Sequence, residues 1–116
     1  MYDVLLGEED IQAAIQPTTD HERLFCVPST INLAGAEIEL VSLVAREQRL
    51  RTALESFLRE SETHFHYVFI DCPPSLGLLT VNAFVAASEV LIPIPCEYYA
   101  LEGLSNLLGN IKLIPV

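Results

Sequence analysis

A short apolar run that ends at an acid and two prolines constrains the fold of this chain more than any other stretch. Residues 67–70 read Tyr-Val-Phe-Ile, which is typical of a strand covered on both faces, as parallel strands under helices are. Asp71 follows, and Pro73 with Pro74 ends any sheet ladder because proline has a fixed φ and no N–H donor. Ser75 can cap the next helix. The stretch therefore predicts a strand, an acid, a stiff loop and a helix.

Asp71 follows the predicted strand at the place where open α/β sheets bind ligands. Ligands of these sheets lie beyond the carboxyl ends of the strands, so a carboxylate there can hold phosphate-bound Mg²⁺ or a water. A plain turn residue would give the same pattern, because acids after strands are common in turns. The pattern by itself leaves both interpretations of Asp71 open.

Strand and helix patterns alternate along the chain. The predicted strands cover residues 23–27, 67–70 and 89–94. Helical patterns cover residues 8–15, 33–43, 44–59, 76–87 and 100–113. This alternation predicts βαβ units and an α/β fold, a parallel sheet with flanking helices. No linker, repeat or low-complexity tract interrupts it, so residues 1–116 are predicted to belong to one domain.

Composition limits the classes of function. Hydrophobic residues make up 51% of the chain, yet it contains no uninterrupted apolar run of about 18 residues, so we expect no membrane association and a cytoplasmic location. Sixteen acids against six lysines and arginines give a formal charge of −10, which opposes binding to a polyanion such as DNA by these residues. The three cysteines form no C-x-x-C pair, so buried reduced thiols are predicted rather than a zinc or redox centre.

Three long strings closely resemble one protein family. Residues 24–40 read LFCVPSTINLAGAEIEL, residues 71–79 read DCPPSLGLL, and residues 93–104 follow the pattern P-x-x-C-E-Y-Y-A-L-E-G-L. They are similar to the ParA/Soj family of chromosome and plasmid partition ATPases, which are deviant members of the P-loop class. The resemblance runs over nearly the whole chain. It implies part of a P-loop NTPase domain, Rossmann-like and three-layered, without the P-loop strand.

The resemblance also implies roles for single residues. Asp71 would be the Walker B-type acid that holds the Mg²⁺ shell through water. The switch loop that senses the terminal phosphate would consist of Cys72, Pro73, Pro74 and Ser75. Glu97, beyond the third predicted strand, could reach the nucleotide ribose or a partner subunit, or it could be an acid that interacts with a helix dipole.

The chain departs from the family at the phosphate-binding motif. The family's K-G-G-x-G-K-T-T type of loop does not occur in the chain, whose single lysine is Lys112 and whose five glycines are isolated. A P-loop needs consecutive backbone N–H groups and a lysine to wrap phosphate. We therefore expect residues 1–116 to be the central part of a ParA-type ATPase domain. We expect this segment alone to hold no cofactor and to neither bind nor hydrolyse ATP.

For the intact protein, the resemblance implies a defined set of partners. ATP and Mg²⁺ would join two subunits into a homodimer, which binds nucleoid DNA nonspecifically through regions absent here until a ParB-type partner stimulates hydrolysis. Whether the cargo is a chromosome or a plasmid stays open. Two alternatives also stay open: a non-catalytic truncated interaction module, which the missing P-loop favours, and a MinD-type division-site regulator. Without a neighbouring P-loop strand, residues 67–70 would have an open edge, and exposed apolar edges associate.

Overall fold

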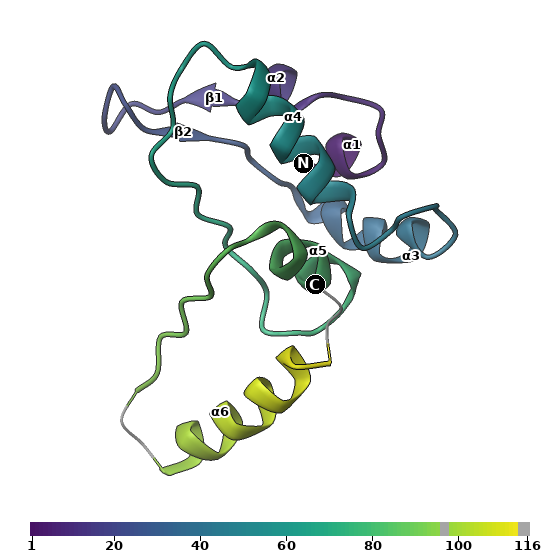
Figure 1. Cartoon of the computed structure of the whole chain (residues 1–116), viewed down its shortest axis with the longest axis vertical. Coiled ribbons are helices and arrows are strands. Elements are labelled where there is room, and N and C mark those ends of the chain that lie inside the picture. The colour runs from purple at the N-terminus through teal and green to yellow at the C-terminus, as the bar shows by residue number, and fades with distance from the viewer. Residues whose placement is uncertain (96–97, 114–116) are drawn as a thin grey trace.

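The computed structural model describes residues 1–95 and 98–113, most of them in helices or the loops between helices (Figure 1). The helices are α1 (Tyr2–Leu5), α2 (Ile11–Ala14), the 3₁₀ segment η1 (Ile31–Gly35), α3 (Ala36–Leu40), α4 (Arg49–Glu60), α5 (Leu78–Ala86) and α6 (Tyr98–Ile111). Strands β1 (Gln16–Pro17) and β2 (Phe25–Cys26) pair antiparallel, with Gln16 opposite Cys26. None of the helices in the described part of the chain has the length and apolar character that a membrane span requires.

Two small apolar clusters hold the N-terminal helices against α4 and α5. The first consists of Leu5, Ala36, Leu40 and Leu50, and the second of Val4, Ile11 and Phe57. Helix α1 contributes to both clusters, because its neighbouring residues Val4 and Leu5 are both buried. Helix α6 lies apart from this body, at the end of the molecule away from β1 and β2 (Figure 1). The clustered part is therefore a packed unit of α1 to α5.

Asn82 is the buried polar residue that joins α5 to α4. Its side chain is fully buried, and its Oδ1 accepts a hydrogen bond from the Leu50 N–H at 3.1 Å. That N–H lies in the first turn of α4, where an amide has no partner within the helix. The Asn82 Nδ2 donates to the carbonyl oxygens of Arg46 and Leu78, each at 2.8 Å. Both polar atoms of the amide are thus hydrogen-bonded, and the start of α4 is fixed relative to α5.

Two predicted helix boundaries are corrected. Helix α4 begins at Arg49 and not at residue 44, because residues 41–48 form a loop in which Ala45 has a left-handed φ of 53°. The Arg46 and Arg49 guanidinium groups donate to carbonyl oxygens of this loop. Helix α5 begins at Leu78 with Gly77 as its N-cap, so Ser75 does not cap it.

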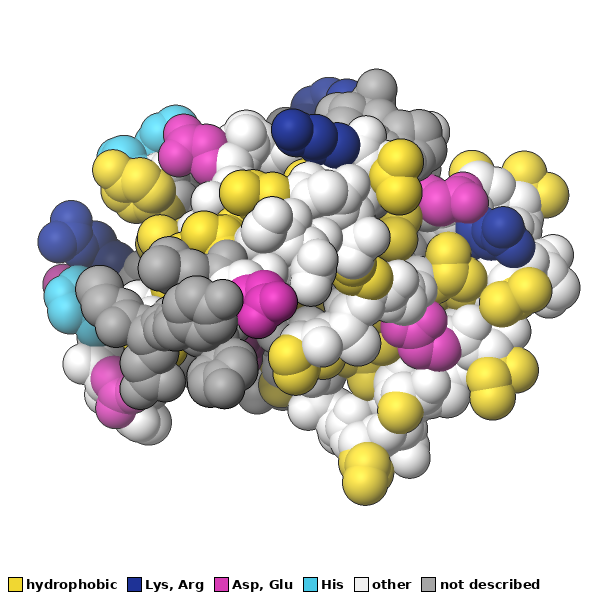
Figure 2. Space-filling model, turned by 90° about the horizontal axis from the view of Figure 1, so that it is seen from below, with side chains coloured by type: hydrophobic (Ala, Val, Ile, Leu, Met, Phe, Trp, Pro, Cys, Tyr) yellow, Lys and Arg dark blue, Asp and Glu magenta, His cyan; other side chains and the backbone are white. Residues whose placement is uncertain are grey.

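The burial predicted for residues 67–70 is wrong. Tyr67 is 80% exposed and Phe69 is 83% exposed, and no strand is assigned to residues 67–70 or 89–94. Sheet strands are defined by ladder hydrogen bonds to a neighbour, and the described residues supply no such ladder there. The cysteine prediction is also wrong for Cys26 and Cys72, which are free thiols but exposed. Figure 2 shows hydrophobic side chains reaching the surface at many separate points of one face.

We expect the substitution Asn82→Ala to destabilise the fold by about 2 to 4 kcal/mol, because it leaves a buried N–H and a carbonyl without partners and opens a cavity. The free energy of unfolding from urea titrations, followed by circular dichroism, measures this cost. Asn106→Ala is the matched control, since Asn106 is exposed on α6. Equal losses for both variants would contradict the role given to Asn82.

The Tyr2 hydroxyl should lose its proton at a higher pH than an unperturbed tyrosine does. A hydrogen bond to the Glu39 carboxylate, together with burial and nearby acids, raises the pKa of Tyr2 from 10.0 to about 12. A raised folded-state pKa gives stability that is complete below pH 10.0 and is lost as the pH rises toward about 12. Difference titration of phenolate absorbance against Tyr2→Phe measures this pKa. Glu39→Gln should return it toward 10.0, and an unchanged value in that variant would show that Glu39 is not the cause.

The chain by itself should associate through the exposed run at residues 67–69, in which the Tyr67 and Phe69 rings stack with centroids 6.3 Å apart. We expect sedimentation velocity to show species that grow with concentration. Tyr67→Lys with Phe69→Lys should reduce them, whereas Ile38→Lys, at a 79% exposed position on α3, should not. A monomer at all concentrations would contradict this expectation.

Candidate functional site

Five of the six predicted site residues, Asp71 to Ser75, lie in one exposed loop, residues 71–76, which leads into α5. Asp71, Pro73 and Ser75 are all exposed. The Ser75 N–H donates to the Pro73 carbonyl oxygen at 2.8 Å, which makes a tight turn around Pro74. Prolines fix φ at two successive positions of this turn. The loop therefore presents a carboxylate to solvent from a short, stiff piece of backbone.

Cys72 is the residue of this loop whose ionisation is perturbed. Cys72 is exposed as a residue, but partial burial of its Sγ atom raises the pKa of the thiol, and the negative charge of Asp71 raises it further. The Cys72 Sγ donates to the Ile70 carbonyl oxygen at 3.5 Å. A thiol with a raised pKa stays protonated at neutral pH and is a poor nucleophile. The Cys72 thiol is thus less nucleophilic at neutral pH than an unperturbed cysteine.

The start of α5 is fixed by a carboxylate from another helix. Glu37 on α3 accepts hydrogen bonds from the Leu78 N–H at 2.7 Å and from the Leu79 N–H at 3.1 Å. These N–H groups belong to the first turn of α5 and have no partners within the helix. Nothing in the sequence near residue 37 indicated this contact, because Leu78 and Leu79 follow Glu37 by 41 and 42 residues. Glu37 is the residue that sequence reasoning missed.

Asp71 is the one carboxylate of loop 71–76. Mg²⁺ keeps most of its waters and takes only one or two carboxylates from a protein. Within residues 1–95 and 98–113, no group of three or more His, Cys, Asp or Glu side chains is arranged to hold a metal ion. A single exposed aspartate could contact Mg²⁺ through a bound water, while phosphate oxygens bind the ion directly.

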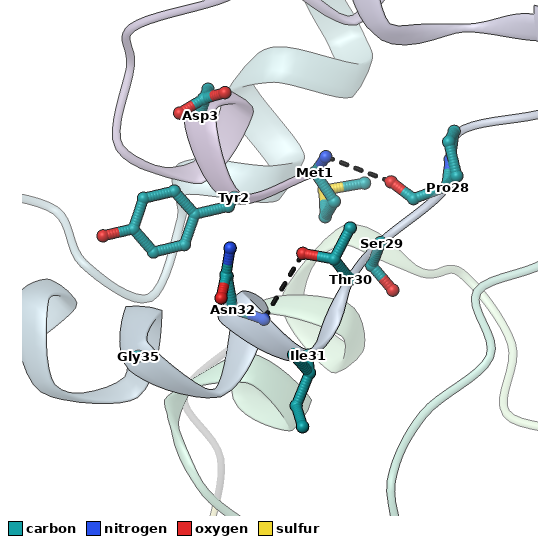
Figure 3. Close-up of a pocket in the computed structure, with 9 residues that line it drawn as sticks. All are labelled: Met1, Tyr2, Asp3, Pro28, Ser29, Thr30, Ile31, Asn32 and Gly35. Atoms are coloured by element: carbon teal, nitrogen blue, oxygen red, sulfur yellow. Dashed lines mark hydrogen bonds between the residues drawn. The ribbon is translucent and has the colours of Figure 1, made fainter.

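A cavity of about 720 Å³ lies elsewhere, between α1 and the residues that lead into η1 (Figure 3). Residues of loop 71–76 do not line it, and neither does any lysine or arginine. Two hydrogen bonds join residues of its lining, from the Met1 amine to the Pro28 carbonyl oxygen and from the Asn32 N–H to the Oγ1 of Thr30, which is the N-cap of η1. With Asp3 in its lining, this cavity is not suited to a phosphate group.

Glu97, the remaining predicted site residue, lies outside the described residues. The other five, Asp71 to Ser75, are consecutive in the sequence and share one exposed loop.

Comparison with known proteins gives consistent relatives. A family model described as an AAA domain matches residues 1–115. The chain is 52% identical over 114 residues to the sporulation initiation inhibitor protein Soj of Bacillus subtilis, covering 98% of this chain and 43% of that protein. It is also 52% identical to the chromosome partitioning protein ParA of Myxococcus xanthus, of which it covers 38%. The chain thus spans less than half the length of these relatives.

A solved structure confirms the predicted fold class. The chain superposes with a TM-score of 0.83 and 40% sequence identity on a crystal structure of cobyrinic acid a,c-diamide synthase from Mycobacterium smegmatis with bound ATP analogue and magnesium. The match covers 96% of this chain and 43% of that one, so the fold is the α/β fold of P-loop NTPases with a partial sheet. The sequence and structural matches agree over nearly all residues. This chain belongs to the AAA-domain family, among its ParA/Soj members.

Proposed function

We propose that this chain is the central, Walker B and switch II part of a ParA/Soj-type ATPase domain. The longer protein would segregate chromosome or plasmid DNA by ATP-dependent dimerisation and binding to the nucleoid. The observation that carries the proposal is the exposed Asp71, placed on a stiff loop immediately before an anchored helix. The names of the relatives at 52% identity support the partition role.

Asp71 would act on the metal side of the nucleotide. Its carboxylate would accept hydrogen bonds from Mg²⁺-bound water and hold that water in place, rather than take a proton from substrate. Bound Mg²⁺ would supply neutralisation of negative charge on the phosphate oxygens. The solved relative has a bound ATP analogue and magnesium, which supports this choice of cofactors.

Residues 72–75 would be the part that responds to the terminal phosphate. Pro73 and Pro74 leave the backbone few conformations, and a loop with few conformations is suited to a two-position switch. The short Ser75-to-Pro73 turn limits movement further. Any change at the phosphate would therefore be passed to α5 rather than absorbed within the loop.

Other functions of the intact protein would lie in regions outside this chain. Phosphate binding needs a glycine-rich loop with a lysine, which the 116 residues do not contain. Nonspecific DNA binding needs a basic surface, whereas the formal charge of these residues is −10. The homodimer contacts and the ParB-type partner are proposed for the longer protein because of its similarity to Soj and ParA.

A second function has one observation in its favour. The exposed Tyr67 and Phe69 give the chain an apolar run, which would suit a non-catalytic module that pairs with another ATPase subunit. Titration with ATP and Mg²⁺ separates the two functions only in the longer protein, because this chain has no phosphate-binding loop.

In the longer protein that contains this chain, we expect Asp71→Ala to lower Mg²⁺-dependent ATP turnover by at least about 10²-fold, because the ordered metal water loses its acceptor. Steady-state phosphate release measures the effect. Asp20→Ala is the matched control, since Asp20 is an exposed acid in the turn between β1 and β2. Unchanged turnover in Asp71→Ala would remove the metal-side role from this residue.

A further inference from the structure

Glu37 links two helices through a single carboxylate. It lies in the first turn of α3, and its oxygens accept the Leu78 and Leu79 N–H groups in the first turn of α5. Two charge-assisted hydrogen bonds to one carboxylate are stronger than neutral ones, and a negative charge is favourable at a helix N-terminus. The contact is half-buried, so solvent competes with it less than on an open surface.

A side chain at position 77 would displace the Glu37 carboxylate from its present place. A Cβ atom built at Gly77 would overlap the Glu37 carboxylate and lie 2.7 Å from its Cδ. The φ of Gly77 is −76°, which any residue can adopt, so its need for glycine comes from space and not from backbone conformation. The contact therefore depends on the absence of a side chain at position 77 as well as on the acid at position 37.

We propose that Glu37 is the positioning residue of the loop that carries Asp71. The proposal rests on the proposed function, because it assigns Glu37 a part in ATP turnover without contact to nucleotide. Loop 71–76 is exposed, and its downstream end joins α5 at Gly77. Glu37 fixes that end, and the Pro73–Ser75 turn transmits the constraint toward Asp71.

The same contact occupies the Leu78 and Leu79 N–H groups, which are therefore not free to bind a ligand. The N-terminus of a helix commonly binds phosphate through its free N–H groups. At α5 a carboxylate already holds two of these groups, and its negative charge repels an approaching phosphate. Phosphate sensing therefore falls to the loop ahead of α5, with Glu37 as its fixed support.

Hydrogen exchange of the Leu78 and Leu79 amides, measured by NMR on this chain, tests the anchor. Glu37→Ala should speed their exchange by about tenfold or more, and the isosteric Glu37→Gln by less, because an amide oxygen can still accept one bond. Gly77→Ala should also speed the exchange of these two amides, because the added Cβ displaces the Glu37 carboxylate. Glu39→Gln is the matched control on α3 and should leave them unchanged. Unchanged exchange in Glu37→Ala would overturn the proposal.

The positioning role needs a readout at the loop itself. In a Cys26→Ser, Cys96→Ser background, the labelling rate of Cys72 by a neutral thiol reagent reports how firmly the loop is held. Glu37→Gln and Gly77→Ala should both raise this rate, because a looser loop releases the Cys72 Sγ from the Ile70 carbonyl oxygen. An unchanged rate in both variants would overturn the proposal, even if the longer protein hydrolysed no ATP.

In the longer protein, Glu37→Gln should lower kcat for ATP by about tenfold and leave KM nearly unchanged, because it displaces a loop without removing a nucleotide contact. A fall in kcat together with faster Cys72 labelling supports the role. Faster amide exchange with unchanged kcat would overturn it and show a purely structural contact. The proposed function fails separately, through unchanged turnover in Asp71→Ala, so the two failures are distinguishable.

Discussion

The packing of this chain depends on the fully buried side-chain amide of Asn82. Its oxygen takes the Leu50 N–H at the start of α4, and its nitrogen binds the Arg46 carbonyl oxygen in the loop before that helix. Burying an amide is favourable only when each polar atom has a partner, so these bonds specify one arrangement of α4 against α5. The apolar cluster of Leu5, Ala36, Leu40 and Leu50 packs beside it and brings α3 within reach of α5.

The position of α3 in turn places Glu37 at the first turn of α5, where it binds the Leu78 and Leu79 amides. Helix α5 is thereby held at two levels: Asn82 ties its middle to α4, and Glu37 ties its beginning to α3. The loop that presents Asp71 is continuous with this fixed beginning. A rigid scaffold with a functional group on an exposed loop is a common arrangement in enzymes, because the scaffold supplies the position and the loop supplies the chemistry.

The loop after Asp71 and the helix that follows it could be predicted from sequence, because prolines are short-range signals. The strand before Asp71 and the cap at Ser75 were predicted wrongly. Family membership followed from long strings such as DCPPSLGLL, and the comparisons confirm it. The support of the site could not be predicted, since Glu37 and Leu78 are 41 residues apart and no local pattern connects them. Burial at residues 67–70 was predicted wrongly because strand patterns assume neighbours that the described residues do not supply.

A crystal structure of the longer protein with Mg²⁺ and a non-hydrolysable ATP analogue tests the central claim most directly. The distance to measure joins the Asp71 carboxylate to the nearest metal-bound water. The account predicts a hydrogen bond there, with the Glu37 carboxylate still on the Leu78 and Leu79 amides. An Asp71 side chain turned away from the metal, with no water between them, would contradict the account.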